Sequence, residues 1–502
     1  MRNIKKIIFN QQTPFWIISI SILIGLTVPT LIQDGMFMDA MLYTSVSHNL
    51  SLGIGTFWFP QFSLHNVAGL SSFHEQPPLV FGILSLFYKL LGDSMYVERF
   101  YTFLTMCITT ILIILFWQEI YRTNNDLKKL SWLPVIFWIT IPVCFWSYSN
   151  NMHENTMGVF TLTSVLLIYK SFKWKKFKFL LWILSGILIF LASLSKGLPG
   201  FFPIVTPLLY WLTTKQINFS KAFRQTLIIS VIPFFIFVIL FLIPESKESL
   251  SIYVYKRLLH RITEDPTVTN RLYILGRLFM ELIPQFILIF IFLIVSKVKK
   301  IEFNFSKQIR ECVFFNSIGI FASLPLMLTL VQKGFYFVPS LPFFAIGLSV
   351  FISPIILYLT KQINLQSKKY RAFIISSILL FSAIITFTLL QIGKTSRNRE
   401  LIHDVYLIGS VVPRQSTISV PEKIWNNWDL QCYLIRYFNI SLETDYKNQF
   451  CIIERIFIIY GNIISFSFKI IFMFENGTII SMPFHEIIFI IFFLYDFIFI
   501  II

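Results

Sequence analysis

The chain has 502 residues, of which 56% are hydrophobic and 13% are charged, and its mean hydropathy is +0.71. A soluble protein of this length is excluded, because it would expose far more charge. A transmembrane barrel is also excluded, because it would show alternating segments of about ten residues. The net charge of +17 does not indicate nucleic-acid binding, because the Lys and Arg residues form short clusters between apolar segments, the pattern that sets membrane topology.

Apolar segments recur along the chain, and most are near the ~20 residues that cross ~30 Å of hydrocarbon. The segment 79–91 is too short to cross and is expected to be an interfacial or re-entrant helix. We therefore predict an all-α polytopic bundle of about 11 to 13 transmembrane helices, the upper number allowing for helices in the apolar tail. The predicted crossings are 14–32, 98–119, 131–148, 156–171, 179–194, 199–213, 226–243, 277–295, 312–330, 338–358 and 372–392.

The basic clusters fix the expected sidedness of these helices. Successive clusters are separated by pairs of apolar segments, so each cluster is assigned to the cytoplasmic side. The N-terminal segment carries one such cluster and no small-residue cleavage site, and is expected to be an anchor helix. The breaks left on the outer side are 33–97, 149–155, 195–198, 244–276, 331–337 and the chain after about 393. Most acids and histidines fall in these outer breaks.

The stretch from Asp34 to Leu79 is the most polar part of the first half of the chain. Asp39 and Tyr43 are four residues apart and share one face if this stretch is helical. An acid at the membrane boundary is costly unless it has a task or a partner, so Asp39 is a candidate general base. The alternative is an N-terminal helix cap, a role that suits Asp34 slightly better.

The outer turn His74-Glu75-Gln76-Pro77-Pro78 is expected to be rigid, because proline fixes its own φ and restricts the residue before it. Glu75 can orient a substrate, bind a divalent metal together with His260, or pair with an outer Arg. The spacing of these residues supports a metal only weakly, so metal dependence is left open. Glu154, beside His153, is either a site residue or a favourable charge at a helix N-terminus.

Several cations lie on the outer side, against the usual orientation signal. Lys196-Gly197 is a tight turn where a ligand can approach the backbone, and Lys333 and Tyr336 form a similar element later in the chain. An anionic ligand such as a phosphate explains the set, and a solvated amphipathic helix is the alternative for the loop. The cations of the loop after the seventh helix are Lys247, Lys256, Arg257, Arg261, Arg271 and Arg277.

From residue 394 to residue 449 the long apolar segments end and the composition becomes more polar. We divide it into a transmembrane domain at 1–393, a small extracytoplasmic α/β segment at 394–450 and a hydrophobic tail of uncertain structure at 451–502. Within the α/β segment, VYLIGSVV and TISV are predicted strands, and WDLQCYLIRYF is a strand or a helix. Cys432 and Cys451 can pair if this region faces an oxidising compartment.

Together these residues resemble the GT-C fold glycosyltransferases that use polyprenyl-phosphate-linked sugars. The closest groups are the protein O-mannosyltransferases and the bacterial transferases that add aminoarabinose or other sugars to lipid A or lipopolysaccharide. The resemblance covers about residues 10–360. It rests on Asp39 to Tyr43, on Phe73 to Leu79 with Gln76 in place of the family's Lys, on Glu154, on Ser195-Lys196-Gly197, and on Lys333, Tyr336 and Pro339.

The resemblance implies an inverting sugar transfer from a polyprenyl-phosphate donor to a lipid, glycan or protein acceptor on the extracytoplasmic face. Asp39 is the implied base, with Asp34 and Glu75 as alternatives. Outer cations would stabilise the departing phosphate. No cofactor is assigned, and a divalent metal is left open. The implied substrate-binding residues are Tyr43, His74, Gln76, Glu154, Lys196, Arg257, His260, Arg261, Arg271, Lys333 and Tyr336. A transporter or flippase of lipid-linked sugars and an inactive membrane scaffold are the alternatives, and a bacterial inner membrane is the expected location.

Overall fold

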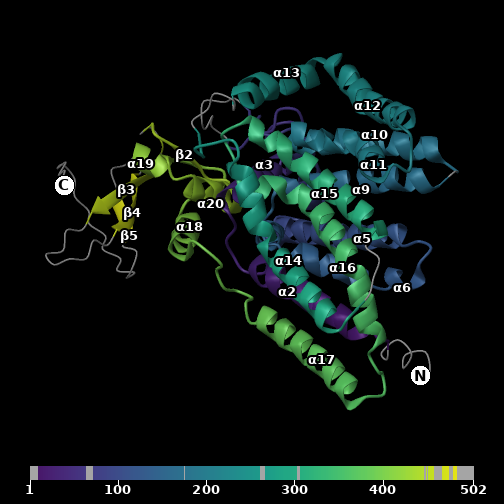
Figure 1. The fold of residues 1–502 in the computed structure, drawn as a ribbon. Coiled ribbons are helices and arrows are strands. Elements are labelled where there is room, and N and C mark those ends of the chain that lie inside the picture. Colours follow the sequence, from purple (N-terminus) through teal and green to yellow (C-terminus); the bar gives the residue numbers. More distant parts are fainter. Residues whose placement is uncertain are drawn as a thin grey trace, which may run out of the picture. The chain divides into compact units, whose positions relative to one another are not determined.

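A computed structural model describes residues 10–63, 72–174, 176–260, 266–301, 306–445, 448, 450–456, 466–473 and 479–482. Figure 1 shows the helices and strands of the chain, which contacts divide into two compact units. The first unit contains Met1–Asp34 and His74–Lys394, and the second contains Gly35–Phe73 and Thr395–Ile502. The division into domains at 1–393, 394–450 and 451–502 stays a prediction. The grouping of Gly35–Phe73 with the C-terminal part was not anticipated.

The first unit is a bundle of helices. Eight stretches of the described chain are long and apolar enough to cross a membrane, so the chain is an integral membrane protein and its predicted all-α polytopic class is confirmed. The α-helices are α2 (Thr13–Leu31), α4 (Leu79–Leu91), α5 (Tyr96–Ile120), α6 (Asn125–Lys128), α7 (Trp132–Ile139), α8 (Pro142–Tyr148), α9 (His153–Lys173), α10 (Lys178–Lys196), α11 (Thr206–Thr214), α12 (Phe219–Phe241), α13 (Pro244–Ile252), α14 (Tyr273–Val298), α15 (Ser306–Ser323), α16 (Leu341–Lys361) and α17 (Lys368–Leu389). Tighter or wider helical turns are η2 (Leu198–Val205), η3 (Tyr253–Leu259), η5 (Leu324–Leu328) and η6 (Gly334–Ser340).

Three predicted crossings differ from simple apolar helices. The segment 131–148 is divided into α7 and α8, because Pro142 lacks the N–H that would continue the first helix. The segment 199–213 begins as the 3₁₀ turn η2, which contains two prolines, before α11 starts. Helix α9 has 21 residues but is rich in buried polar side chains. These three segments are helical, and their crossing of the membrane stays a prediction.

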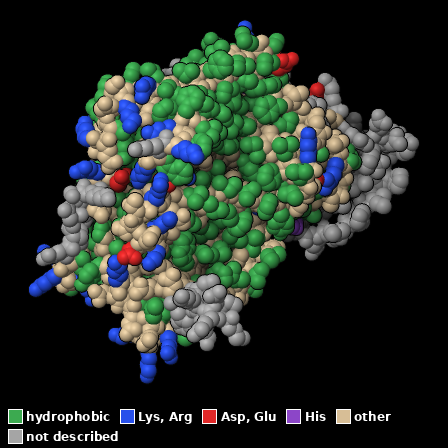
Figure 2. All heavy atoms as spheres, turned by 90° about the vertical axis from the view of Figure 1, so that its right-hand side faces the viewer, with side chains coloured by type: hydrophobic (Ala, Val, Ile, Leu, Met, Phe, Trp, Pro, Cys, Tyr) green, Lys and Arg blue, Asp and Glu red, His purple; other side chains and the backbone are tan. Residues whose placement is uncertain are grey.

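Helices α12 and α17 present long apolar faces to the surroundings. Only 17% of the most apolar window of each is buried within the protein. On α12 the exposed positions include Leu227, Val231 and Phe234, which recur at helical spacing. Figure 2 shows hydrophobic side chains over much of one face, with Lys and Arg side chains gathered toward its edges. These are the surfaces that contact lipid in a membrane protein.

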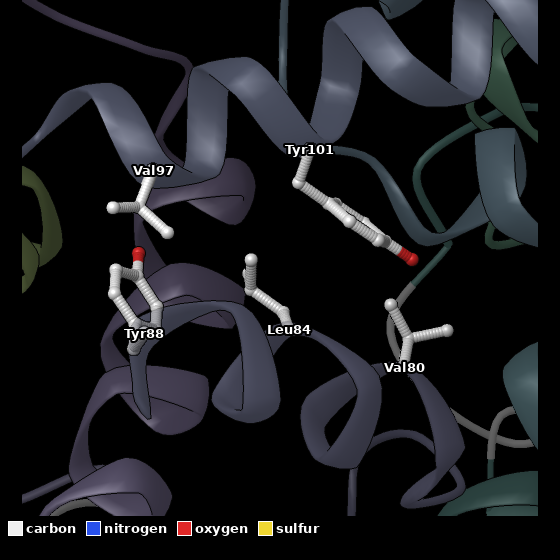
Figure 3. Close-up of a cluster of buried hydrophobic side chains, with 5 residues drawn as sticks. All are labelled: Val80, Leu84, Tyr88, Val97 and Tyr101. Carbon is white, nitrogen blue, oxygen red and sulfur yellow. The ribbon is translucent and has the colours of Figure 1, made fainter. Parts of the chain in front are cut away.

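Helix α4 packs on the start of α5 through Val80, Leu84, Tyr88, Val97 and Tyr101, which lie between the two helices (Figure 3). At 13 residues α4 is shorter than a crossing, as expected. The α4–α5 contact fixes the position of the turn that precedes α4.

A buried charge network holds the first residues of this unit to α5. Arg99 forms ion pairs with Asp34 at 3.6 Å and with Glu98 at 3.3 Å, and its side chain is 3% exposed. The Arg99 Nε atom also donates a hydrogen bond to the Gln33 carbonyl at 3.1 Å, and the Tyr88 hydroxyl donates to Glu98 at 2.8 Å. Asp34 is therefore half of a structural ion pair.

The second unit combines helices with a small sheet. Its helices are α3 (Met38–Ser51), α18 (Arg399–Val411), α19 (Glu422–Trp425) and α20 (Trp428–Phe438). Strands β1 (Thr417–Ser419), β2 (Ser441–Glu443), β3 (Phe450–Ile456), β4 (Phe466–Met473) and β5 (Ile479–Met482) form one sheet in the order β2-β1-β3-β4-β5. Strand β1 is parallel to β2 and β3, and β4 is antiparallel to β3 and β5. The expected α/β segment is confirmed.

Hydrogen bonds join α3 and the residue Met36 just before it to α20 within the second unit. The Tyr433 hydroxyl donates to the Met36 carbonyl at 2.9 Å and accepts from the Met36 N–H at 3.0 Å. The Ser45 hydroxyl donates to the Cys432 carbonyl at 3.0 Å. These contacts explain why a segment near the start of the chain belongs to the C-terminal unit.

One local prediction for the second unit was wrong, and a conditional pairing of two cysteines is not seen. VYLIGSVV lies in α18, where Ile402, Val405 and Ile408 are buried at helical rather than alternating spacing. Cys432 and Cys451 are both free thiols. TISV is confirmed as β1, and WDLQCYLIRYF is the helix α20. Parts of the tail are strands rather than membrane helices, and most of its remaining residues lie outside the described ones.

Replacing Arg99 with Leu is expected to lower the free energy of unfolding by about 3–5 kcal/mol, because Asp34 and Glu98 would keep buried charges without their cation. The measurement is a denaturant titration of the purified protein in detergent. The control is Lys129→Leu, since Lys129 is 57% exposed in its pair with Asp126, and a change of at most about 1 kcal/mol is expected there. Equal losses in both variants would contradict a special role for the buried network.

Candidate functional site

A cavity of about 180 Å³ lies within the first unit, between the start of α9, the end of α10 and the segments η3, η5 and η6. Most of its wall is apolar, and its polar members are one acid, one cation, two tyrosines and a threonine. The lining residues are Glu154, Met157, Lys196, Leu198, Pro199, Tyr253, Leu258, Leu259, Pro325, Leu326, Leu328, Thr329, Val331 and Tyr336. The cavity thus has the two-part character expected for an amphipathic ligand.

The cation of the cavity is held by a buried ion pair. The Lys196 Nζ atom lies 3.0 Å from Glu154 Oε1, and the two side chains are 6% and 1% exposed. The Tyr336 ring faces the same ammonium group, with Nζ 5.7 Å from the ring centroid. Burying a charged pair is costly, and removing one partner would leave the other charge uncompensated. These three residues, from distant parts of the sequence, were all predicted site residues and lie together.

The backbone beside Lys196 is shaped by Gly197, which ends α10 at a φ of +82°. A Cβ atom at this position would lie 2.0 Å from the Tyr253 hydroxyl oxygen. Only glycine therefore allows Tyr253 to lie against the turn that carries Lys196. Tyr253 was missed by the sequence analysis, and its one signal there is the four-residue spacing from Arg257.

Tyr253 begins η3, a π-helical segment that also carries Arg257, Leu258 and Leu259. Such segments are rare in proteins and are frequent at functional sites. Tyr253, Leu258 and Leu259 line the cavity, whereas Arg257 pairs with Glu75, its Nη2 lying 2.9 Å from Oε2. One short segment thus forms a cavity wall and contacts the outer turn.

The outer turn before α4 makes two contacts with α13 and η3. Besides the Glu75–Arg257 ion pair, His74 Nδ1 lies 3.4 Å from the Ser249 hydroxyl. Burial, and next the charge of Lys256, lowers the pKa of His74 from 6.5 to about 4. His74 is therefore neutral near pH 7. Of the three roles open to Glu75, pairing with an Arg is the one present.

The other predicted residues of this unit are more dispersed. Gln76 is buried in the turn, whereas the side chains of His260, Arg271 and Lys333 are exposed. The Arg271 carbonyl accepts a hydrogen bond from Gln332, and Lys333 precedes η6 as its N-cap residue. Arg261 lies outside the described residues. In the described part of the chain, no group of three His, Cys, Asp or Glu side chains could hold a metal ion.

Helix α3 of the second unit carries Asp39 in its first turn and Tyr43 one turn later, as predicted. The N-cap residue is Phe37, so neither Asp34 nor Asp39 is the helix cap. Tyr43 is buried, and Asp39 is half-buried. Burial and then the charges of Asp429 and Asp39 raise the pKa of the Cys432 thiol, which places Asp39 near α20.

Comparisons with known proteins identify the fold. No protein-family model matches the sequence, and no curated protein matches it. Among solved structures, ArnT from Cupriavidus metallidurans in the apo state is similar, with a TM-score of 0.57 and 11% identity over 83% of this chain and 82% of ArnT. ArnT bound to undecaprenyl phosphate has a TM-score of 0.57 and 13% identity over 84% of each chain. The predicted GT-C fold is thus confirmed.

A weaker similarity extends to the apo oligosaccharyltransferase of Archaeoglobus fulgidus. Its TM-score is 0.47, with 13% identity over 88% of this chain and 66% of the oligosaccharyltransferase.

Gly197→Ala is expected to destabilise the protein more than Gly92→Ala. Both glycines have similar positive φ angles, but no atom lies within 4 Å of a Cβ at Gly92. The Gly92 variant should cost only backbone strain of about 1–3 kcal/mol, whereas the Gly197 variant adds overpacking of about 1–3 kcal/mol against Tyr253. In a Tyr253→Ala background the added cost should disappear, as measured by denaturant titration. An unchanged cost in that background would contradict the contact.

As the pH is lowered from about 6.5 to 4, the folded state should lose stability more steeply in the parent than in His74→Gln. The folded-state pKa of His74 is below its unfolded value, so the unfolded state binds the extra proton in this interval and stability is lost as pH falls. The measurement is the melting temperature of both proteins in detergent from pH 8 to 4. Parallel profiles would show that His74 is not buried as a neutral group.

Proposed function

We propose that this chain is a membrane glycosyltransferase that uses a polyprenyl-phosphate sugar as its donor. The observation that carries the proposal is Lys196, a buried cation in an otherwise mostly apolar cavity on the fold of ArnT. The fold alone does not give a reaction. The ArnT structure bound to undecaprenyl phosphate supports a lipid phosphate as the class of donor.

The walls of the cavity match the two parts of such a donor. The apolar residues of η2, η3 and η5 suit an isoprenoid chain, and Lys196 suits the phosphate. When the sugar leaves, negative charge grows on the phosphate, and a fixed cation stabilises that charge. Removing one such group typically costs about 2.7–4 kcal/mol of barrier. Glu154 and Tyr336 would keep the ammonium group in position before the donor arrives.

We further propose Asp39 as the general base, with inversion at the anomeric carbon. Its support is chemical: a half-buried carboxylate in the first turn of α3, one helical turn from Tyr43. Asp34 is a weaker candidate because it pairs with Arg99, and Glu75 is weaker because it pairs with Arg257. The acceptor is a lipid, glycan or protein on the extracytoplasmic face.

The remaining outer residues are proposed as secondary contacts for substrate. His74 and Gln76 belong to the turn that contacts α13 and η3. Arg257 can bind a phosphate only if its ion pair with Glu75 breaks. The exposed side chains of His260, Arg271 and Lys333 suit the sugar or the acceptor rather than the lipid chain. A bacterial inner membrane with the cavity facing outward is the proposed location, in keeping with the basic clusters.

Purified protein supplied with a panel of polyprenyl-phosphate sugars should release polyprenyl phosphate, whereas Asp39→Asn should not. Lys196→Gln should lower kcat by about 10²–10³-fold, because the leaving phosphate loses its cation. The double variant Lys196→Gln/Glu154→Gln removes both buried charges, so it should recover stability without recovering transfer.

The control for these variants is Lys129→Gln, which should transfer at the parent rate because Lys129 is exposed, pairs with Asp126 and does not line the cavity. Transfer at the parent rate by the double variant would refute the role of Lys196. Equal release by the parent and Asp39→Asn would refute Asp39 as the base.

A further inference from the structure

A basic and aromatic cluster lies where α9 ends and α10 begins. It consists of Arg122, Lys170, Lys173 and Trp174, together with the carboxylate of Glu119, and is called the Trp174 cluster below. The Arg122 guanidinium carbon lies 5.3 Å from the centroid of the Trp174 ring, and Lys170 Nζ lies 5.7 Å from it. Two cations thus share one indole ring, an arrangement that orients both.

The ring itself is fixed by a hydrogen bond. Trp174 Nε1 donates to Glu119 Oε1 at 3.1 Å, and Lys173 Nζ donates to the carbonyls of Glu119 and Ile120 at 3.2 and 3.3 Å. Glu119 is buried, whereas the Trp174 side chain remains 38% exposed. The indole is therefore held with part of its surface open, rather than packed into a core.

The Trp174 cluster lies at the other end of α9 from the cavity. Glu154 is in the first turn of α9, and Trp174 follows its last residue, Lys173. Twenty residues at about 1.5 Å each span about 30 Å, which is the thickness of the hydrocarbon layer. If the cavity opens at one membrane surface, the Trp174 cluster lies at the opposite one.

The chain that follows continues the same pattern. Lys176 Nζ lies 5.1 Å from the Phe177 ring centroid, and Lys178 begins α10. Phe177 and Phe179 are 60% and 62% exposed, similar to Val231 and Phe234 on the outward face of α12. Basic groups beside exposed aromatic rings suit the headgroup level of a bilayer. Among the described residues, five cations and one buried acid lie in this region, so it attracts anions.

We propose that the Trp174 cluster binds the phosphate of an anionic phospholipid headgroup at the membrane surface opposite the cavity. Arg122 and Lys170 would contact the phosphate, and Phe177 and Phe179 would contact the acyl region. A topology signal alone needs positive charge but no ring that holds two cations in place. This site is independent of the proposed glycosyltransferase function.

The test is native mass spectrometry of the full chain in detergent, with phosphatidylglycerol or phosphatidylcholine titrated in. The parent should retain phosphatidylglycerol in preference to phosphatidylcholine. The variant Arg122→Gln/Lys170→Gln/Lys176→Gln should bind phosphatidylglycerol about tenfold more weakly. Trp174→Leu, which keeps every charge, should also weaken binding, because the cations lose their common ring.

The matched control is Lys368→Gln/Lys369→Gln/Arg371→Gln, which removes three exposed charges from the start of α17. This control should bind phosphatidylglycerol as the parent does. Equal weakening in the control would overturn the proposal in favour of general basicity, and so would an unselective parent. Inorganic phosphate alone should add no stable bound mass, and a stable phosphate adduct without lipid would overturn the assignment to a headgroup.

Discussion

The ion pair between Lys196 and Glu154 is the interaction on which the candidate site depends. A lysine of this kind stays charged inside a protein only if an acid compensates it. The pair therefore requires α9 to begin beside the end of α10, and Gly197 allows Tyr253 to close against the same turn. The result is a fixed cation beside an apolar wall. That combination is unusual for a core and suitable for a lipid phosphate.

The surroundings of this pair are built from short, irregular segments rather than from long helices. The 3₁₀ and π-helical turns η2, η3, η5 and η6 supply most of the cavity wall, and prolines at several of their positions prevent regular α-helix. Long helices such as α12 and α17 instead present apolar faces outward. Regular helices satisfy their own backbone hydrogen bonds and can therefore face lipid, whereas irregular turns occur where protein surrounds them.

Much of this arrangement could be predicted from the sequence. Apolar runs located the helices, the two prolines located the outer turn, and Lys196-Gly197 was recognised as a tight turn beside a cation. Three features could not be predicted. Tyr253 looks ordinary until its contact with Gly197 is seen, Arg99 is one cation at the start of an apolar helix, and VYLIGSVV has a composition that suits strand or helix equally. Tyr253 and Arg99 contact Gly197 and Asp34, which are distant in the sequence, so only the folded chain reveals these contacts. For VYLIGSVV, tertiary packing decides between strand and helix.

The most direct test of the account is to locate a bound lipid phosphate. A polyprenyl phosphate carrying a photoreactive group on its first isoprene unit would be cross-linked to the purified protein, and the labelled peptides would be identified by mass spectrometry. The account predicts labelling of the peptides that contain Leu198 or Leu326, and loss of that labelling in Lys196→Gln/Glu154→Gln. Labelling confined to the outward faces of α12 and α17, unchanged by these substitutions, would contradict it.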